Sequence, residues 1–194
     1  MAQFSIPKPI SLDSEWVVFF IRHGQCKSNV TWPIENYHDD IDVLTELGIN
    51  QALSCAKYLD SRFSQFEFKI ITSELKRARQ TGETLLKRTK GSIVFSDKRI
   101  NEYSNKDEDI KKFHARIDSF LDDLNNLTLQ DNERVLIITH GFVLENLVCK
   151  ALDAKINGID KGGYGGQKGI CTHSNCGLSA FYRKELLLWN FNAA

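Results

Sequence analysis

Short apolar runs alternate with amphipathic stretches along most of this chain. Apolar runs of about four to eight residues that are rich in Val, Ile and Phe are typical of buried strands. Between them, apolar residues recur every three or four positions, which is the spacing of one helix face. The pattern predicts strands over residues 16–21, 66–72, 92–95 and 134–139.

The intervening stretches predict four helices, over residues 45–63, 74–90, 107–124 and 142–152. Thr45 and Ser73 are suitable N-caps for the first two, because a hydroxyl can accept a bond from a backbone NH of the first turn. Gly91 is a suitable end for the second helix. The apolar positions expected to pack the first helix on the core are Leu44, Leu47, Ala52, Cys55, Leu59 and Phe63.

The end of the sequence changes character. Residues 157–169 hold six glycines and are expected to form a loop, and two apolar runs at 178–182 and 186–191 predict an antiparallel hairpin. The strand–helix alternation before it predicts an α/β sandwich with a mostly parallel sheet. We expect one domain over residues 1–194, with an irregular lead-in at 1–14.

The composition excludes several classes of partner. Lys and Arg number 25, as do Asp and Glu, so no overall charge favours nucleic acid or an acidic membrane surface. The cysteines number five, and we expect them to be reduced thiols. No apolar window reaches the roughly 18 residues of a membrane helix, and no signal peptide is evident. These features predict a cytoplasmic protein without nucleic-acid or membrane partners.

Two of the predicted strands, 16–21 and 134–139, are followed closely by the dipeptide His-Gly. Because parallel strands end at the same edge of a sheet, the two histidines are expected to meet there. A lone histidine at a strand end is more often structural than catalytic, but guanidinium groups arrive at the same edge and favour an anion site. The converging residues are Arg22, His23, Arg77 and His140.

Four stretches resemble signature motifs of the histidine phosphatase superfamily, also called phosphoglycerate-mutase-like. They are Arg-His-Gly-Gln-Cys-Lys-Ser-Asn at 22–29, Leu-Thr-Glu-Leu-Gly at 44–48, Thr-Ser-Glu-Leu-Lys-Arg-Ala-Arg-Gln-Thr at 72–81, and the segment 135–141. The resemblance follows the family order over most of the chain. It implies a three-layer α/β/α fold and catalysis through a phosphohistidine.

The resemblance also implies a role for individual residues. His23 matches the nucleophile, and Glu102 matches the proton donor. The residues that match phosphoryl ligands are Arg22, Arg77 and His140, with Asn29, Gly24, Gln25 and Gly141 as further substrate-binding positions. An imidazole attacks phosphorus only when it is deprotonated and oriented, and guanidinium groups neutralise the dianion that it attacks.

The chain departs from the mutases of the family. Ser28 stands where they typically carry tryptophan, and only residues 103–106 connect Glu102 to the next acidic helix start. A short connection covers less of the pocket, and a mutase must exclude water to return the phosphoryl group to its substrate. We therefore expect hydrolysis of a phosphorylated small molecule or a phosphoprotein, without metal or cofactor. A phosphoglycerate mutase and a non-catalytic phospholigand-binding protein are the alternatives.

Two other groups of residues compete with this interpretation. Glu145, on the apolar helix after His140, is a second candidate for the acid and ranks below Glu102. Cys171, His173 and Cys176 weakly resemble a metal site. Zinc ligands usually come in pairs from two places in the chain, so we expect no metal there.

Overall fold

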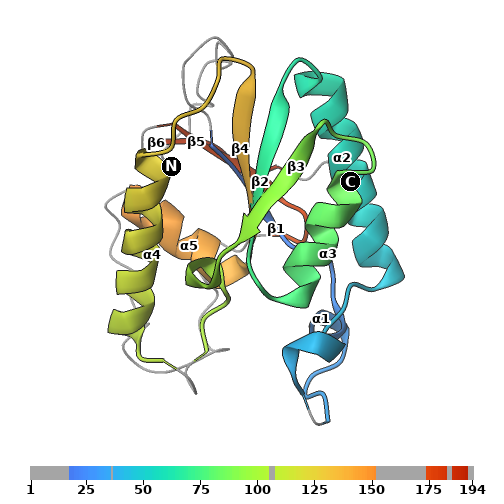
Figure 1. The fold of residues 1–194 in the computed structure, drawn as a ribbon. Helices are drawn as coiled ribbons and strands as arrows, with labels where there is room; N and C mark the ends of the chain where they lie inside the picture. The colour runs from blue at the N-terminus through green and yellow to red at the C-terminus, as the bar shows by residue number, and fades with distance from the viewer. Residues whose placement is uncertain (1–17, 36, 105–107, 152–173, 183–184, 192–194) are drawn as a thin grey trace, which may run out of the picture.

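The computed structural model describes residues 18–35, 37–104, 108–151, 174–182 and 185–191. Six strands in these ranges form one sheet in the order β3-β2-β4-β1-β5-β6 (Figure 1). The first four in this order are mutually parallel, while β5 runs antiparallel to β1 and to β6. The strands are β1 (Val18–Arg22), β2 (Glu67–Thr72), β3 (Gly91–Ser96), β4 (Glu133–Thr139), β5 (Leu178–Tyr182) and β6 (Glu185–Phe191).

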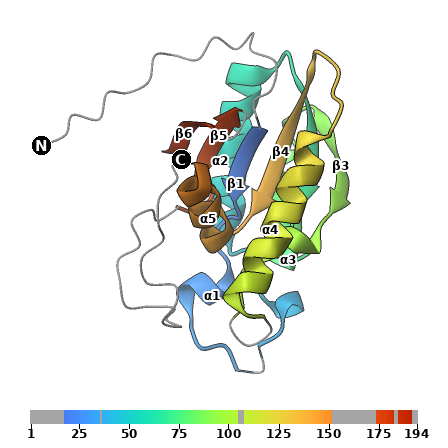
Figure 2. The same cartoon turned by 90° about the vertical axis from the view of Figure 1, so that its left-hand side faces the viewer.

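Helices cover both faces of the sheet, so the predicted three-layer α/β/α sandwich is confirmed (Figures 1 and 2). Successive side chains of β1 show the division, because Phe19 and Ile21 pack in one core cluster and Phe20 in the other. The first cluster includes residues of α2 (Glu46–Phe63) and α3 (Lys76–Leu85), and the second includes residues of α4 (Ile110–Asn125) and α5 (Gly141–Ala151).

The start of α2 agrees with its sequence signals except at one position. Thr45 is the N-cap, and its hydroxyl oxygen accepts a hydrogen bond from the Gly48 NH at 3.1 Å. Ala52, Cys55 and Leu59 are buried as expected. The prediction that Leu47 packs in the core is wrong, because its side chain is 52% exposed. Five positions before Ala52, it lies about 140° around the helix from the buried face.

The prediction for the next helix is wrong at both ends. α3 begins at Lys76 after Leu75, and the Ser73 hydroxyl donates to Oδ1 of Asn101 at 2.7 Å instead of capping the helix. The helix ends at Leu85, and Gly91 begins β3. Gly91 has a φ of +148°, and a Cβ there would lie 2.1 Å from the Phe68 carbonyl oxygen. Glycine is therefore required by the close strand contact rather than by a helix end.

The remaining differences concern element boundaries. α4 begins at Ile110 and not at 107, because Asp109 caps it by accepting from the Lys112 NH at 2.9 Å. The polar loop expected after β1 contains the short helices α1 (Lys27–Val30) and η1 (Asp39–Ile41), and η2 (Lys98–Ile100) follows β3. The start of the first predicted strand (16 and 17) and the glycine-rich stretch 157–169 lie outside the described residues. In the part that is described, no helix is both long and apolar enough to span a bilayer.

The parallel register sets where the strands end. Arg22, the last residue of β1, pairs with Thr139, the last residue of β4. On the other side of β4, Thr72 at the end of β2 pairs with Ile138. Three strands thus end side by side, and the residues that follow each strand lie at the same edge of the sheet.

Gly24 and Gly48 allow the chain after β1 to contact the start of α2, and a Cβ on Gly24 would lie 2.5 Å from the Gly48 carbonyl oxygen. A Cβ on Gly48 would lie 2.0 Å from the Gln25 carbonyl oxygen. Replacing Gly48 with alanine should lower the free energy of unfolding by about 1–3 kcal/mol, because backbone atoms on both sides would have to move apart. Urea unfolding of the purified variant measures this change.

Gly141→Ala is the matched control, since its Cβ would meet nothing nearer than the Arg22 Nε at 3.5 Å, an ordinary contact. Its free energy of unfolding should stay within about 0.5 kcal/mol of the unsubstituted protein. Equal stability of the two variants would contradict the close contact at Gly48.

Candidate functional site

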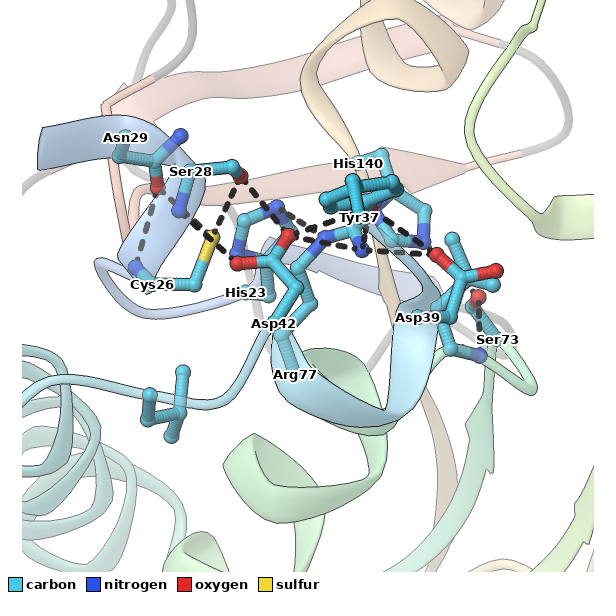
Figure 3. Close-up of polar contacts among 12 residues, drawn as sticks. His23, Cys26, Ser28, Asn29, Tyr37, Asp39, Asp42, Ser73, Arg77 and His140 are labelled. Carbon is cyan, nitrogen blue, oxygen red and sulfur yellow. Dashed lines mark hydrogen bonds and ion pairs between the residues drawn. The ribbon is translucent and has the colours of Figure 1, made fainter. Parts of the chain in front are cut away.

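The carboxyl ends of β1, β2 and β4 bring several buried polar side chains together (Figure 3). His23 follows β1, and its backbone NH donates to the Thr139 carbonyl of β4 at 2.9 Å. Asn175 Nδ2 donates to the His23 carbonyl at 3.1 Å, and the His23 side chain is only 3% exposed. The histidine is therefore fixed on both sides of its backbone by the sheet and by the segment that precedes β5.

The hydrogen bonds of the His23 ring identify its tautomer. Nδ1 lies 2.8 Å from the Gly24 carbonyl oxygen, which can only accept, so Nδ1 carries the proton. Nε2 accepts a hydrogen bond from Arg77 Nε at 3.3 Å, as an unprotonated nitrogen does. The Nε2 lone pair of this neutral imidazole is directed toward the Arg77 guanidinium.

The surroundings keep His23 neutral. Burial is the largest cause that holds the pKa of His23 well below its usual value, and the positive charges of Arg77 and Arg22 act in the same direction. The bond to Gly24 opposes them and does not reverse the shift. An unprotonated imidazole beside two guanidinium groups has the properties of a nucleophile for an anionic centre.

Arg77 is buried and is held by residues of the segment before α2 (Figure 3). Its Nη1 lies 3.2 Å from Oδ2 of Asp42, which is fully buried, and 3.6 Å from Oδ1 of Asp39. The same nitrogen lies 3.4 Å from the Tyr37 hydroxyl. Asp42 in turn accepts from the Ser28 NH at 2.9 Å and from the Ser28 hydroxyl at 2.8 Å. The sequence did not predict that these residues hold Arg77.

Arg22 and Gly141 occupy adjacent positions where β1 and β4 end. A Cβ on Gly141 would meet the Arg22 Nε at 3.5 Å and Cζ at 3.6 Å, so the guanidinium lies against the glycine. Its charge also contributes to the lowered pKa of both His23 and His140. The structure thus brings together Arg22, His23, Arg77, His140 and Gly141 from the predicted set.

His140 is fully buried, and its ring centroid lies 5.0 Å from that of His23. Its Nε2 is 2.8 Å from the Ser73 hydroxyl, whose own proton is donated to Asn101 Oδ1. Ser73 must then accept from His140, which places the proton of the neutral ring on Nε2. Nδ1 is left without a proton, and it has no hydrogen-bond partner among the residues that the structure describes.

Glu102 is partly buried after η2, and its Oε1 accepts from the Tyr103 NH at 3.1 Å. Burial raises the pKa of Glu102, although Arg77 and Arg22 act to lower it. Glu145 on α5 senses the charge of Glu102, and burial together with that charge raises the pKa of Glu145 to about 7. Burial thus raises the pKa of both carboxyl groups, and Glu102 is the one that interacts with the charges of both Arg77 and Arg22.

The remaining predicted positions have mainly structural contacts. The Gln25 side chain accepts from the Thr45 hydroxyl at 2.8 Å and so points to α2. Gly24 donates its NH to the Thr81 hydroxyl at 3.1 Å. Asn29 Oδ1 accepts from the Cys26 NH and from Asn175 Nδ2, each at 3.1 Å, which orients its amide beside His23. The Gln25 amide oxygen is thus engaged by the N-cap residue of α2.

No cluster of three or more His, Cys, Asp or Glu side chains suited to a metal ion occurs in the described ranges. Cys171 and His173 lie outside those ranges, and Cys176 is buried beside the Arg22 and His23 carbonyls.

Comparison with known proteins gives a match to one family. The model of the histidine phosphatase superfamily, branch 1, matches residues 18–107 and 94–172. A broad-specificity phosphatase from Saccharomyces cerevisiae is 38% identical over 77 residues, which are 40% of this chain and 32% of the yeast protein. The aligned segment is therefore about a third of that relative's length.

Solved structures show the same fold at lower identity. A mycobacterial glucosyl-3-phosphoglycerate phosphatase complexed with VO3 has a TM-score of 0.66 and 20% identity, covering 91% of this chain and 99% of the other. YhfR from Bacillus stearothermophilus has a TM-score of 0.65 and 19% identity, covering 89% of this chain and 94% of the other. Likeness at these identities concerns the fold.

The tautomers can be observed directly. Nitrogen NMR of the imidazoles should show His23 protonated at Nδ1 and His140 protonated at Nε2 at neutral pH. Ser73→Ala removes the acceptor of the His140 proton and should move the tautomer equilibrium of His140 toward Nδ1, while His23 keeps its tautomer. An unchanged His140 spectrum in this variant would contradict the assignment.

The two neutral histidines should make stability depend on pH. The unfolded chain takes up protons at these imidazoles below about pH 6.5, while the folded state keeps them neutral. The free energy of unfolding should therefore fall as the pH drops below that value, measured by urea unfolding between pH 7.5 and 5.5. The double variant His23→Asn/His140→Asn should lose less unfolding free energy over this range. An equal loss in the variant and the unsubstituted protein would contradict the prediction. Carboxyls with raised pKa values act in the opposite direction in both proteins and cancel in the comparison.

Proposed function

Because the chain belongs to the histidine phosphatase superfamily, we propose that it hydrolyses phosphomonoesters through a phosphohistidine formed on His23. The observation that carries the proposal is the state of the His23 ring. Its Nδ1 proton is engaged by the Gly24 carbonyl, and its Nε2 is an unprotonated acceptor beside the Arg77 guanidinium. A neutral imidazole oriented in this way can attack a phosphorus atom that Arg77 holds.

The first half of the reaction forms the phosphoenzyme. Nε2 of His23 attacks phosphorus, and the bond from phosphorus to the ester oxygen breaks. Arg77 and Arg22 neutralise charge on the phosphoryl oxygens, where positioning and electrostatics supply most of the barrier reduction. A bound phosphoryl dianion also raises the pKa of His140, so that Nδ1 takes a proton from solvent, donates it in a hydrogen bond to a phosphoryl oxygen, and returns it to solvent when phosphate leaves.

Glu102 manages the proton of the leaving group. Burial raises the pKa of Glu102 and so favours its protonated form, which gives its proton to the departing alkoxide. The resulting carboxylate then accepts a proton from the water that attacks the phosphohistidine. The bond between phosphorus and Nε2 breaks, inorganic phosphate leaves, and both groups return to their first state.

The proposal includes metal independence, because guanidinium and imidazole groups supply the positive charge that a metal would otherwise provide. It also includes a phosphorylated small molecule or a phosphoprotein as substrate. Hydrolysis is favoured over mutase transfer by the short chain between Glu102 and α4, which begins at Ile110. A short connection there covers less of the site, so that water can reach the phosphohistidine and hydrolyse it.

Replacing the nucleophile should abolish turnover. We expect His23→Ala to lower kcat/KM for p-nitrophenyl phosphate at least about a thousandfold, because no other group can form the intermediate. An acid-labile phosphoenzyme should be trapped in the unsubstituted protein and be absent from this variant. Excess EDTA should leave the activity unchanged.

Matched variants separate the site from its surroundings. Arg77→Ala should abolish activity, while Arg79→Ala, an exposed arginine on the same helix, should keep it. Glu102→Gln should lower kcat/KM about 10²- to 10⁴-fold, a larger loss than that of Glu145→Gln.

Full activity in His23→Ala would disprove the mechanism, and phosphoryl transfer within phosphoglycerate faster than phosphate release would establish a mutase. Tight phospholigand binding without turnover would indicate a binding protein.

A further inference from the structure

The end of α1 and the segment that follows it expose large apolar side chains. Residues 30–35 and 37–42, which we call the entry loop, carry three of the seven large hydrophobic side chains that are exposed in the described part of the chain. They are Val30, Trp32 and Tyr37, exposed by 62%, 66% and 37%. Exposed apolar side chains gathered at one place are typical of a surface that binds a ligand or a partner.

This aromatic surface is continuous with the proposed catalytic site. The rings of Trp32 and Tyr37 meet edge to face, with their centroids 5.4 Å apart. The Tyr37 hydroxyl is 3.4 Å from Nη1 of Arg77, which in turn contacts His23 through Nε. A phosphoryl group held by Arg77 therefore has the aromatic pair as a near neighbour, and the rest of its substrate can reach the two rings.

The entry loop also carries negative charge beside Arg77. The Asp39 carboxylate lies 3.6 Å from Nη1 of Arg77 and 3.0 Å from the Tyr37 hydroxyl, yet its side chain remains 51% exposed (Figure 3). Asp40 beside it is exposed as well. The buried Asp42 already offsets one guanidinium charge. A second negative charge on the substrate that reached this loop would thus meet the exposed carboxylates of Asp39 and Asp40.

Aromatic faces attract cations and apolar surface, and carboxylates repel anions. We propose that Trp32, Tyr37 and Asp39 form a leaving-group subsite that selects phosphomonoesters whose alcohol part has apolar surface and a positive charge. Esters with a further negative charge on that part, phosphoglycerates among them, are selected against. This inference rests on the proposed hydrolysis at His23 and names the substrate class of the same site.

Two esters of matched size test the subsite. O-phosphotyramine and the phosphate ester of 4-hydroxyphenylacetate share a phenol leaving group and differ mainly in a terminal ammonium or carboxylate. We expect kcat/KM to favour phosphotyramine by about three- to tenfold, the effect of an exposed carboxylate. The preference should shrink as salt is raised, because exposed charges are screened.

Substitutions assign the preference to the subsite. Asp39→Asn should reduce the ratio between the two esters toward one. Trp32→Ala should lower kcat/KM for phosphotyramine several-fold and leave inhibition by inorganic phosphate unchanged, because the ring contacts the leaving group only. Leu47→Ala is the control, since it removes another exposed apolar side chain, on α2.

The outcomes are distinct. Hydrolysis of both esters with a ratio near one, or with a ratio that Asp39→Asn does not alter, overturns the subsite and leaves the phosphatase standing. If Trp32→Ala changes kcat/KM for phosphotyramine no more than Leu47→Ala does, the subsite is likewise overturned. If the folded protein hydrolyses p-nitrophenyl phosphate but neither ester, the subsite is wrong and the phosphatase stands. If it hydrolyses none of the three compounds, the proposed function is wrong and so is the subsite.

Discussion

The parallel pairing of β1 with β4 is the constraint on which the site depends. Arg22 pairs with Thr139, and the next backbone NH along the chain, that of His23, continues the pattern by donating to Thr139. Because side chains alternate between the two faces of a sheet, a slip of one residue would exchange the faces of β1 and separate the two histidines. The apolar alternation of Phe19, Phe20 and Ile21 between two cores prevents that slip. Core packing thus sets the distance between His23 and His140.

A second constraint is the cost of burying positive charge. A guanidinium removed from water needs partners, and Arg77 finds them in Asp42, Asp39 and Tyr37. Asp42 is itself held by the backbone and hydroxyl of Ser28, so the loop after β1 orients the arginine on α3. Ser28 stands where mutases of the family typically have tryptophan, and the structure gives this serine a definite role in the arrangement of charges.

The sequence predicted the layered fold and the meeting of the histidine-bearing strand ends, because apolar runs and His-Gly dipeptides are local patterns. It could not predict contacts between distant segments. Ser73 has the residue type and place of an N-cap, and only the position of Asn101 shows that its hydroxyl serves His140. Asp42 resembles any acidic loop residue until its complete burial is known. The helical pattern could include Leu47 because periodicity defines a face only to within a residue or two.

The carboxylates around Arg77 also bear on how a bound anion leaves. In the proposed reaction, an incoming phosphoryl group has to share the guanidinium with Asp42 and to displace Asp39, which is half exposed and 3.6 Å away. When inorganic phosphate departs, Asp39 can return to the same nitrogen without waiting for solvent to reorganise. Under the proposed mechanism the protein thus exchanges an external anion for an internal one, and Asp39 competes with inorganic phosphate for Arg77.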